Sequence, residues 1–271
     1  MSLGEPYLKN NLDTRVELPE FYDVMYSHMY ENASGKTPML LFIGYDGCRA
    51  DMLTAVADNT IHGMKTGVAR VRMGGTLLLG KAGGKNKGDQ PPVTAPGWTA
   101  IFTGTWSDVN KVYKNKDAKS PDVNTLFYKL NESGIAATFA YSWANYHNHI
   151  YTDEYAAKPY MFCFGNDDDA TVNSMLTAIS GGMRAVFGIL EYTDKAGHMN
   201  GFNPKNANYK KAFQKAELAA DKLINAVFAR PTYEEEDWMI IIASDHGGYF
   251  NGHESHNLPT TTTFFAVNKK I

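Results

Sequence analysis

Continuous runs of apolar residues recur along this chain, and each is followed by polar residues. Such runs, when bounded by glycine or polar residues, are typical of strands that are buried on both faces of a parallel sheet. We therefore predict a strand in each of the segments PMLLFIGYDG, GIAATFAYSW, AVFGILEYTD and IIIASDHG, and a last strand in FFAVN.

Helical patterns separate these predicted strands. They cover residues 49–64, 122–133 and 206–230, and strands that alternate with helices favour a parallel sheet with helices on both faces. The polar and glycine-rich stretches 74–89 and 108–119 predict loops. The first is not expected to cradle a phosphate, because it does not follow the strand, glycine loop and helix order of a P-loop.

Composition narrows the possible functions. The 271 residues include 26 basic and 29 acidic ones, a net charge of −3 that argues against duplex nucleic acid or a membrane surface as the partner. A 44% hydrophobic content predicts one large domain over residues 1–271. No apolar run reaches the roughly 18 residues of a membrane span. No signal peptide is visible, which favours a cytoplasmic location, with secretion open if a leader was removed.

Three of the predicted strands run into an aspartate: Asp46, Asp194 and Asp245. Each aspartate alone has an ordinary explanation, as a helix cap or a turn residue. The carboxyl ends of parallel strands meet at one edge of the sheet, however, so the three carboxylates are expected to lie close together. Such a cluster of like charges is unfavourable unless a cation holds it together.

Histidines accompany these aspartates. His198 follows Asp194 by four residues, His246 is adjacent to Asp245, and His253 occurs in the segment FNGHESH. Mixed aspartate and histidine ligands suit zinc, with manganese or iron as alternatives, whereas calcium and magnesium favour oxygen ligands alone. We prefer His253 to His256 as a ligand because the preceding glycine lets the backbone approach a metal closely.

At this point the sequence resembles a known family. The segments GYDGCRADML, VTAPGWTAIFTG, YTDKAGHMNG and SDHGGYFNGH occur in the order used by the alkaline phosphatase superfamily, and most resemble its nucleotide pyrophosphatase/phosphodiesterase branch. The resemblance covers residues 38–253. It implies an alkaline-phosphatase-like α/β fold, two zinc ions at the carboxyl edge of the sheet, and a threonine or serine that attacks phosphorus.

The resemblance also implies roles for single residues. One zinc ion would be held by Asp194, His198 and His253, and the other by Asp46, Asp245 and His246. Thr94 would be the nucleophile and would contact the second metal. Asn115 would donate a hydrogen bond to a phosphoryl oxygen, since it follows Gly104 at the family's spacing. The sequence departs from the family shortly before it, where Val109 and Asn110 replace a common His-Gly pair.

The chemistry of these residue types agrees with the resemblance. Two metal ions about 4 Å apart can hold the attacking and leaving oxygens of an in-line displacement. Metal coordination also favours the alkoxide of a threonine. A helix that begins near Trp98 would direct unpaired backbone N–H groups at the phosphate. Further residues that could line a substrate pocket are Trp143, Tyr146, His147 and His149, of which the histidines are better explained as polar loop residues.

The sequence therefore predicts a metal-dependent hydrolase of phosphodiesters whose substrate is a small phosphate ester, with nucleotides among the candidates. The alternatives are a phosphomonoesterase, a phosphonate hydrolase and a non-catalytic zinc-stabilised binding protein. A sulfatase is disfavoured, because Thr94 is neither cysteine nor serine and Trp98 stands where the sulfatase motif has arginine. Few cations lie near the motifs, which favours diesters over monoesters, although Lys195 lies between two predicted ligands. Oligomeric state is not indicated.

Overall fold

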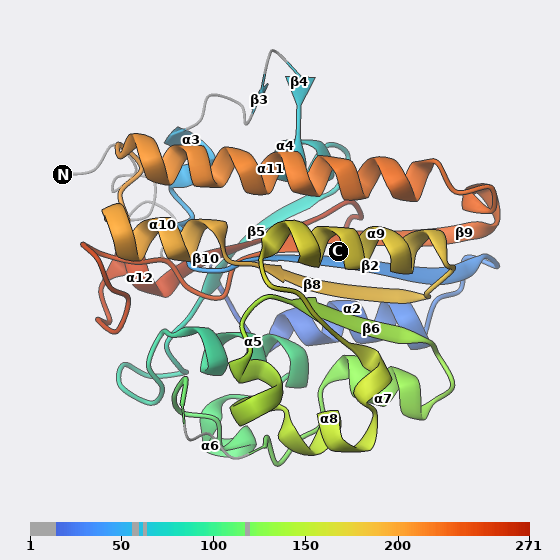
Figure 1. The fold of residues 1–271 in the computed structure, drawn as a ribbon, viewed down its shortest axis with the longest axis horizontal. Coiled ribbons are helices and arrows are strands. Elements are labelled where there is room, and N and C mark those ends of the chain that lie inside the picture. Colours follow the sequence, from blue (N-terminus) through green and yellow to red (C-terminus); the bar gives the residue numbers. More distant parts are fainter. Residues whose placement is uncertain (1–14, 56–59, 62–63, 117–119) are drawn as a thin grey trace.

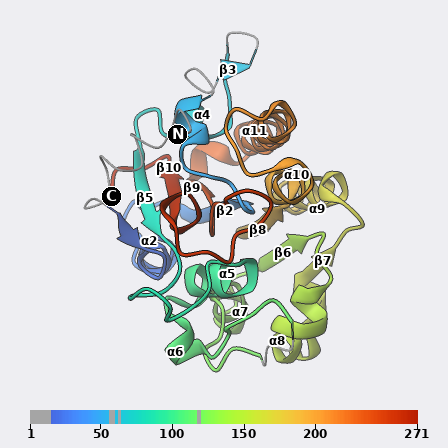
Figure 2. The same ribbon diagram turned by 90° about the vertical axis from the view of Figure 1, so that its left-hand side faces the viewer.

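An eight-stranded sheet forms the centre of the protein, with helices on both of its faces (Figures 1 and 2). The computed structural model describes residues 15–55, 60–61, 64–116 and 120–271. The strand order is β1 (Val16–Glu17), β5 (Thr76–Lys81), β10 (Thr262–Val267), β9 (Glu236–Ala243), β2 (Thr37–Tyr45), β8 (Ala185–Leu190), β6 (Ala137–Tyr141) and β7 (Phe162–Phe164). Of these strands, β10 alone runs opposite to the rest. The predicted α/β fold with a mostly parallel sheet is confirmed.

The central strands are buried on both faces, which explains their continuous apolar sequences. In β2, Leu40 and Phe42 join the core on one face, whereas Leu41 and Ile43 join the core on the other. This alternation follows from the two-residue period of a strand. A sheet that is covered on both sides needs apolar residues at every position, and the runs seen in the sequence are its signature.

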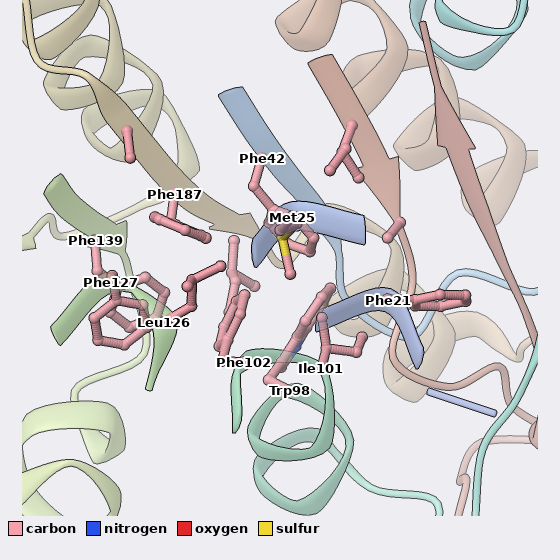
Figure 3. Packing of buried hydrophobic residues seen from close by; sticks show 14 of the residues in the cluster. Phe21, Met25, Phe42, Trp98, Ile101, Phe102, Leu126, Phe127, Phe139 and Phe187 are labelled. Atoms are coloured by element: carbon pink, nitrogen blue, oxygen red, sulfur yellow. The ribbon is translucent and has the colours of Figure 1, made fainter. Parts of the chain in front are cut away.

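Two sets of helices cover the two faces (Figure 2). One face packs against α2 (Glu20–Tyr30), α5 (Thr94–Thr103) and α7 (Leu126–Glu132), and the other against α4 (Gly67–Val71), α9 (Asp168–Ser180) and α11 (Ala207–Phe228). Figure 3 shows Trp98 and Phe102 of α5 packed near Phe42 and Phe187 of the sheet. The remaining helices are α3 (Met52–Ala55), α6 (Ser107–Asn110), η3 (Tyr146–Ile150), α8 (Thr152–Ala157), η4 (Pro159–Met161), α10 (Tyr192–Asn200), η5 (Tyr233–Glu235) and α12 (Leu258–Thr261).

Of the three predicted helices, one is confirmed, one begins later than predicted and one is wrong. The helix predicted over 206–230 is confirmed as α11, and Asn206 caps it by accepting hydrogen bonds from two backbone N–H groups. The helix predicted over 122–133 begins only at Leu126, after the capping residue Thr125. The helix predicted over 49–64 is wrong. There, α3 is short, Thr60–Ile61 and Met64–Lys65 form the strands β3 and β4, and residues 56–59 and 62–63 lie outside the described residues.

The two predicted loops also need correction. Residues 74–89 contain β5, whose sequence TLLLGK pairs along its whole length with β10. The apolar part of this strand is short and flanked by glycines, so its sequence reads as a loop. In the second stretch, the first residues of 108–119 belong to α6, and 117–119 lie outside the described residues.

Candidate metal centre

Three neighbouring strands bring the predicted aspartates to one edge of the sheet. The strands β9, β2 and β8 are adjacent and parallel, so their carboxyl ends meet. Asp46 follows β2 directly and Asp245 lies two residues beyond β9. Asp194 does not end its strand as predicted, because β8 stops at Leu190 and Asp194 lies in the first turn of α10. His198 is therefore one helical turn further along the same face.

The six predicted ligands form two groups of three. In each group, one potential ligand atom from every residue lies within 4.8 Å of the others. The first group is Asp194, His198 and His253, and the second is Asp46, Asp245 and His246. The groups adjoin, since the rings of His246 and His253 stack with their centroids 4.0 Å apart.

Distances within the groups suit a shared cation. In the first group, the Nε2 atoms of His198 and His253 face each other at 3.1 Å, and His198 Nε2 lies 3.4 Å from Asp194 Oδ2. In the second, His246 Nε2 lies 3.3 Å from Asp245 Oδ2 and 3.6 Å from Asp46 Oδ1. Asp194 Oδ1 and Asp245 Oδ2 are among the seven buried side-chain atoms of the described residues that have no hydrogen-bond partner, so both oxygens are available to a cation.

The pKa values of these residues also favour a bound cation. Burial, followed by the charges of Asp245 and Asp194, raises the pKa of Asp46 well above its ordinary value. Burial likewise raises the pKa of Asp194 to about 6 and lowers that of His253 to about 4. Burial at this centre therefore disfavours the ionised form of the carboxylates and the protonated form of the imidazoles. A bound cation reverses this penalty, because it stabilises ionised carboxylates and takes neutral histidines as ligands.

Thr94 lies at the second group. It is the first residue of α5, and its side chain is buried. The hydroxyl donates to Asp46 Oδ1 at 3.3 Å and lies 3.4 Å from His246 Nε2. The structure therefore places a hydroxyl oxygen among the atoms of the second group, where the resemblance puts a nucleophile.

Asn115 lies beside the first turn of α5. Its Oδ1 accepts a hydrogen bond of 2.9 Å from the backbone N–H of Ala95, which leaves its NH₂ group as a donor. The helix begins at Thr94 rather than near Trp98 as predicted, and this contact pairs one of the N–H groups that were expected to be free at its start. The N–H of Ala95 is used by Asn115, Pro96 has none, and the N–H of Gly97 donates to Val93.

A cavity of about 310 Å³ opens onto the centre. Its lining consists of Asp46, Thr94, Asn115, Trp143, Glu191, Asp194, Lys195, His198 and His253. Sequence reasoning missed Glu191, which is the first polar residue after the apolar run of β8 and could have been noticed for that reason. Trp143 is the one residue of the predicted pocket-lining set that lies in this lining.

The other histidines and aromatic residues lie elsewhere. His256 Nε2 contacts the carbonyl oxygen of Gln90 at 2.8 Å and belongs to neither group. His147 Nδ1 lies 2.9 Å from the Tyr141 hydroxyl, and Tyr146 is completely buried. The structure thus brings His253 to the centre. A Cβ at Gly252 would meet no atom of the protein within 4 Å, so no protein contact requires that glycine, and its close approach to a metal stays a prediction.

Other glycines do permit close approach. Gly47 has a positive φ of 62°, and a Cβ there would lie 2.6 Å from Asp194 Oδ1. A Cβ at Gly97 would lie 2.9 Å from the Cβ of Asp245. The glycines after His246 serve packing, since Gly247 lies against the backbone of Pro259 and Gly248 against the Phe202 ring.

The fold and the centre define a class: an α/β protein with two adjoining candidate metal sites at the carboxyl edge of its sheet. Residues 40–260 match the family described as type I phosphodiesterase / nucleotide pyrophosphatase, and the chain belongs to this family. The predicted family resemblance is confirmed. Comparison with curated protein sequences found no match.

Solved structures share the fold at low sequence identity. BT1596, a 2-O GAG sulfatase, has a TM-score of 0.62 and 13% identity over 86% of this chain and 64% of its own. Murine ectonucleotide pyrophosphatase / phosphodiesterase 5 has a TM-score of 0.55 and 15% identity over 77% of this chain and 57% of its own. An inactive threonine-to-alanine form of that murine protein, in complex with AMP, has a TM-score of 0.54. The chain thus spans less than two thirds of these structures. Its alkaline-phosphatase-like fold agrees with them.

Among the described helices, none is both long and apolar enough to cross a membrane.

Proposed function

We propose that this protein is a metal-dependent hydrolase that cleaves phosphodiester bonds, with Thr94 as its nucleophile. The observation that carries the proposal is the position of the Thr94 hydroxyl, 3.3 Å from Asp46 and 3.4 Å from His246 within the second ligand group. Membership of the phosphodiesterase family supports this reaction type. A hydroxyl placed among metal ligands is activated by coordination and needs no separate base.

Two zinc ions are the proposed cofactors, with manganese or iron as alternatives. Asp194, His198 and His253 would hold one ion, and Asp46, Asp245 and His246 the other. When bound, such a pair supplies positive charge that offsets the charge on the oxygens of the phosphoryl group. The unpartnered oxygens Asp194 Oδ1 and Asp245 Oδ2 support this ligand set.

Thr94 and Asn115 are the proposed catalytic residues. Thr94 Oγ1 would lose its proton and form the new bond to phosphorus while the bond to the leaving oxygen breaks, and that oxygen leaves as an alcohol. The covalent intermediate is a phosphodiester of Thr94 that keeps the substrate's second ester group. Water would then displace the threonine oxygen from phosphorus, which releases the phosphomonoester and restores the hydroxyl. The NH₂ group of Asn115 is free to donate to a phosphoryl oxygen, since its Oδ1 is held by Ala95. Two displacements at phosphorus give net retention of configuration.

The proposed substrate is a small phosphate ester, and a nucleotide is the first candidate. The AMP complex of the murine phosphodiesterase supports this choice, and so does Trp143 in the cavity lining, because an indole face can stack on a base. The sulfatase neighbours raise the possibility of sulfate esters, but Thr94 cannot yield the formylglycine that sulfatases use. A phosphomonoesterase, a phosphonate hydrolase and a zinc-stabilised binding protein are the other candidates.

The test is hydrolysis of bis(p-nitrophenyl) phosphate by the zinc-supplemented protein and its Thr94 variants. Thr94→Ala should lower kcat by about a hundredfold or more and abolish the p-nitrophenylphosphoryl adduct on the protein, as measured by mass spectrometry. Thr94→Ser should keep part of the activity, because the hydroxyl survives. Thr99→Ala is the matched control, since Thr99 lies in the same helix and its hydroxyl contacts Tyr151. Normal turnover by Thr94→Ala would mean that water attacks phosphorus directly.

A further inference from the structure

One ion pair lies in the wall of the candidate active-site cavity. Lys195 Nζ is 2.7 Å from Glu191 Oε2, and both residues line the cavity with Asp46 and Asp194. Among the described residues of that lining, Lys195 is the one lysine or arginine. Any positive charge that the protein itself offers to a substrate there comes from this ammonium, and Glu191 already neutralises it.

The position of Glu191 is fixed by the structure around it. Its backbone N–H donates to Asp168 Oδ1 at 3.0 Å, and the same oxygen accepts from the Ser142 hydroxyl. The backbone N–H of Lys195 donates to the carbonyl oxygen of Glu191 at 3.0 Å. The side chain of Glu191 is 12% exposed, against 52% for Lys195. The carboxylate is therefore the more buried partner of the pair, on a backbone held by hydrogen bonds, and the ammonium is the more exposed one.

We propose that Glu191 is a specificity-determining residue that favours monoanionic phosphodiesters over dianionic phosphomonoesters. This inference rests on the proposed function and specifies its substrate class. A monoester carries one more negative charge than a diester and needs an additional cation in the site. Glu191 withholds that cation by pairing with Lys195, and its own carboxylate repels a second negative charge. A diester, with one charge, loses little from this arrangement.

The neutral variant Glu191→Gln keeps the size of the side chain and releases the ammonium. The ratio of kcat/KM for bis(p-nitrophenyl) phosphate to that for p-nitrophenyl phosphate should fall about tenfold in this variant. Lys195→Met leaves the carboxylate uncompensated and should raise the ratio. The double variant should return it to about the wild-type value, because neither charge remains.

Asp169→Asn is the matched control. It changes the net charge as Glu191→Gln does, and its carboxylate contacts the Tyr192 hydroxyl outside the cavity lining. It should leave the ratio unchanged, and zinc content measured for every variant should stay equal. An equal loss toward both substrates in Glu191→Gln would overturn the inference, and so would a lower ratio in Lys195→Met, which would mean that Lys195 contacts the diester.

A binding experiment separates this inference from the proposed function. If the zinc-loaded wild-type protein hydrolyses neither substrate, the proposed function fails. Titration calorimetry with inorganic phosphate and with dimethyl phosphate then tests the pair itself. Glu191→Gln should tighten phosphate about tenfold relative to dimethyl phosphate. An unchanged ratio of the two dissociation constants would overturn the inference.

Discussion

The indole N–H of Trp98 donates a hydrogen bond of 2.9 Å to the carboxylate of Asp46, and so joins α5 to the end of β2. The ring fits because β2 has glycine at position 44, where a Cβ would lie 2.6 Å from an indole atom. Trp98 is completely buried and lies one turn after Thr94. A candidate ligand and the candidate nucleophile are thus held in register by one side chain.

We expect Trp98→Phe to lower the free energy of unfolding by about 2 kcal/mol, because it removes a buried hydrogen bond to a carboxylate and leaves a void. Urea unfolding followed by circular dichroism measures this. Trp106→Phe is the control, since its indole also donates to a carboxylate, that of Glu17, at a partly buried site. An equal loss of unfolding free energy in both variants would show that the hydrogen bond to Asp46 stabilises the protein no more than the one to Glu17.

Gly97→Ala should damage the centre although alanine favours helices. Its Cβ would come within 2.9 Å of the Cβ of Asp245, so either α5 or Asp245 must shift. We expect turnover to fall about a hundredfold, as small displacements of reacting groups do. Gly252→Ala adds the same methyl group where no protein atom lies within 4 Å and should keep nearly full activity. Full activity of Gly97→Ala would show that the contact is easily relieved.

The purified protein should contain about two zinc ions, or a comparable metal, per chain. Removal of metal by a chelator should lower Tm, because buried carboxylates then lose their counter-charge, and added zinc should restore it. Asp245→Asn should reduce the metal content to about one ion by impairing the second group alone. Elemental analysis and thermal scans decide this. A metal-free protein whose Tm does not respond to zinc would contradict the ligand assignment.

Asn251 should contribute to zinc affinity without contacting the metal. Its backbone oxygen lies 2.9 Å from His198 Nδ1, and its side-chain amide donates to the backbone oxygen of His198, also at 2.9 Å. The first contact places a proton on Nδ1 and leaves Nε2 free to bind a metal. Asn251→Leu keeps the backbone oxygen but removes the side-chain hydrogen bond that holds it beside His198, and should weaken zinc binding about tenfold in competition titrations. Asn203→Leu, in a neighbouring loop, is the control, and equal affinities would refute this role.

Glu217 should make stability depend on pH. Burial raises its pKa to about 8, well above the ordinary value of 4.5, so the folded protein holds a proton that the unfolded chain releases. Its contribution to stability is therefore complete below pH 4.5 and is lost as pH rises toward 8. Glu217→Gln should remove this loss, which amounts to at most about 1.4 kcal/mol per pH unit. Urea unfolding from pH 5 to 8.5 would show parallel curves if the carboxyl does not titrate.

Patterns that depend on neighbours in sequence predicted much of the fold. The strands β2, β8 and β9 were predictable because burial on both faces leaves an uninterrupted apolar run. Asp46 and Asp245 were predictable as neighbours because they follow such runs directly. That residues 1–271 form a single domain remains a prediction, and so does the location of the protein in the cell.

Features that depend on tertiary contacts were not predicted from the sequence. The strand β5 is stable because it lies between β1 and β10, although its own sequence is short and rich in glycine. The helix α10 was missed since its first turn looks like the end of a strand. The hydrogen bond from Ala95 to Asn115 joins segments that no pattern connects. Glu191 differs from these, because its ion pair with Lys195 is local; what the sequence did not indicate is that both residues line the cavity with Asp46, Thr94 and His253.

The reversed strand β10 bears on how the protein is made. It lies between β5 and β9 and is hydrogen-bonded to both, so the sheet cannot close until the ribosome has delivered residues 262–267. Before then, the backbone edges of β5 and β9 that β10 covers in the folded sheet are open. Exposed edges of this kind recruit other chains. Correct pairing of β10 therefore also protects the protein from association with other chains through its sheet.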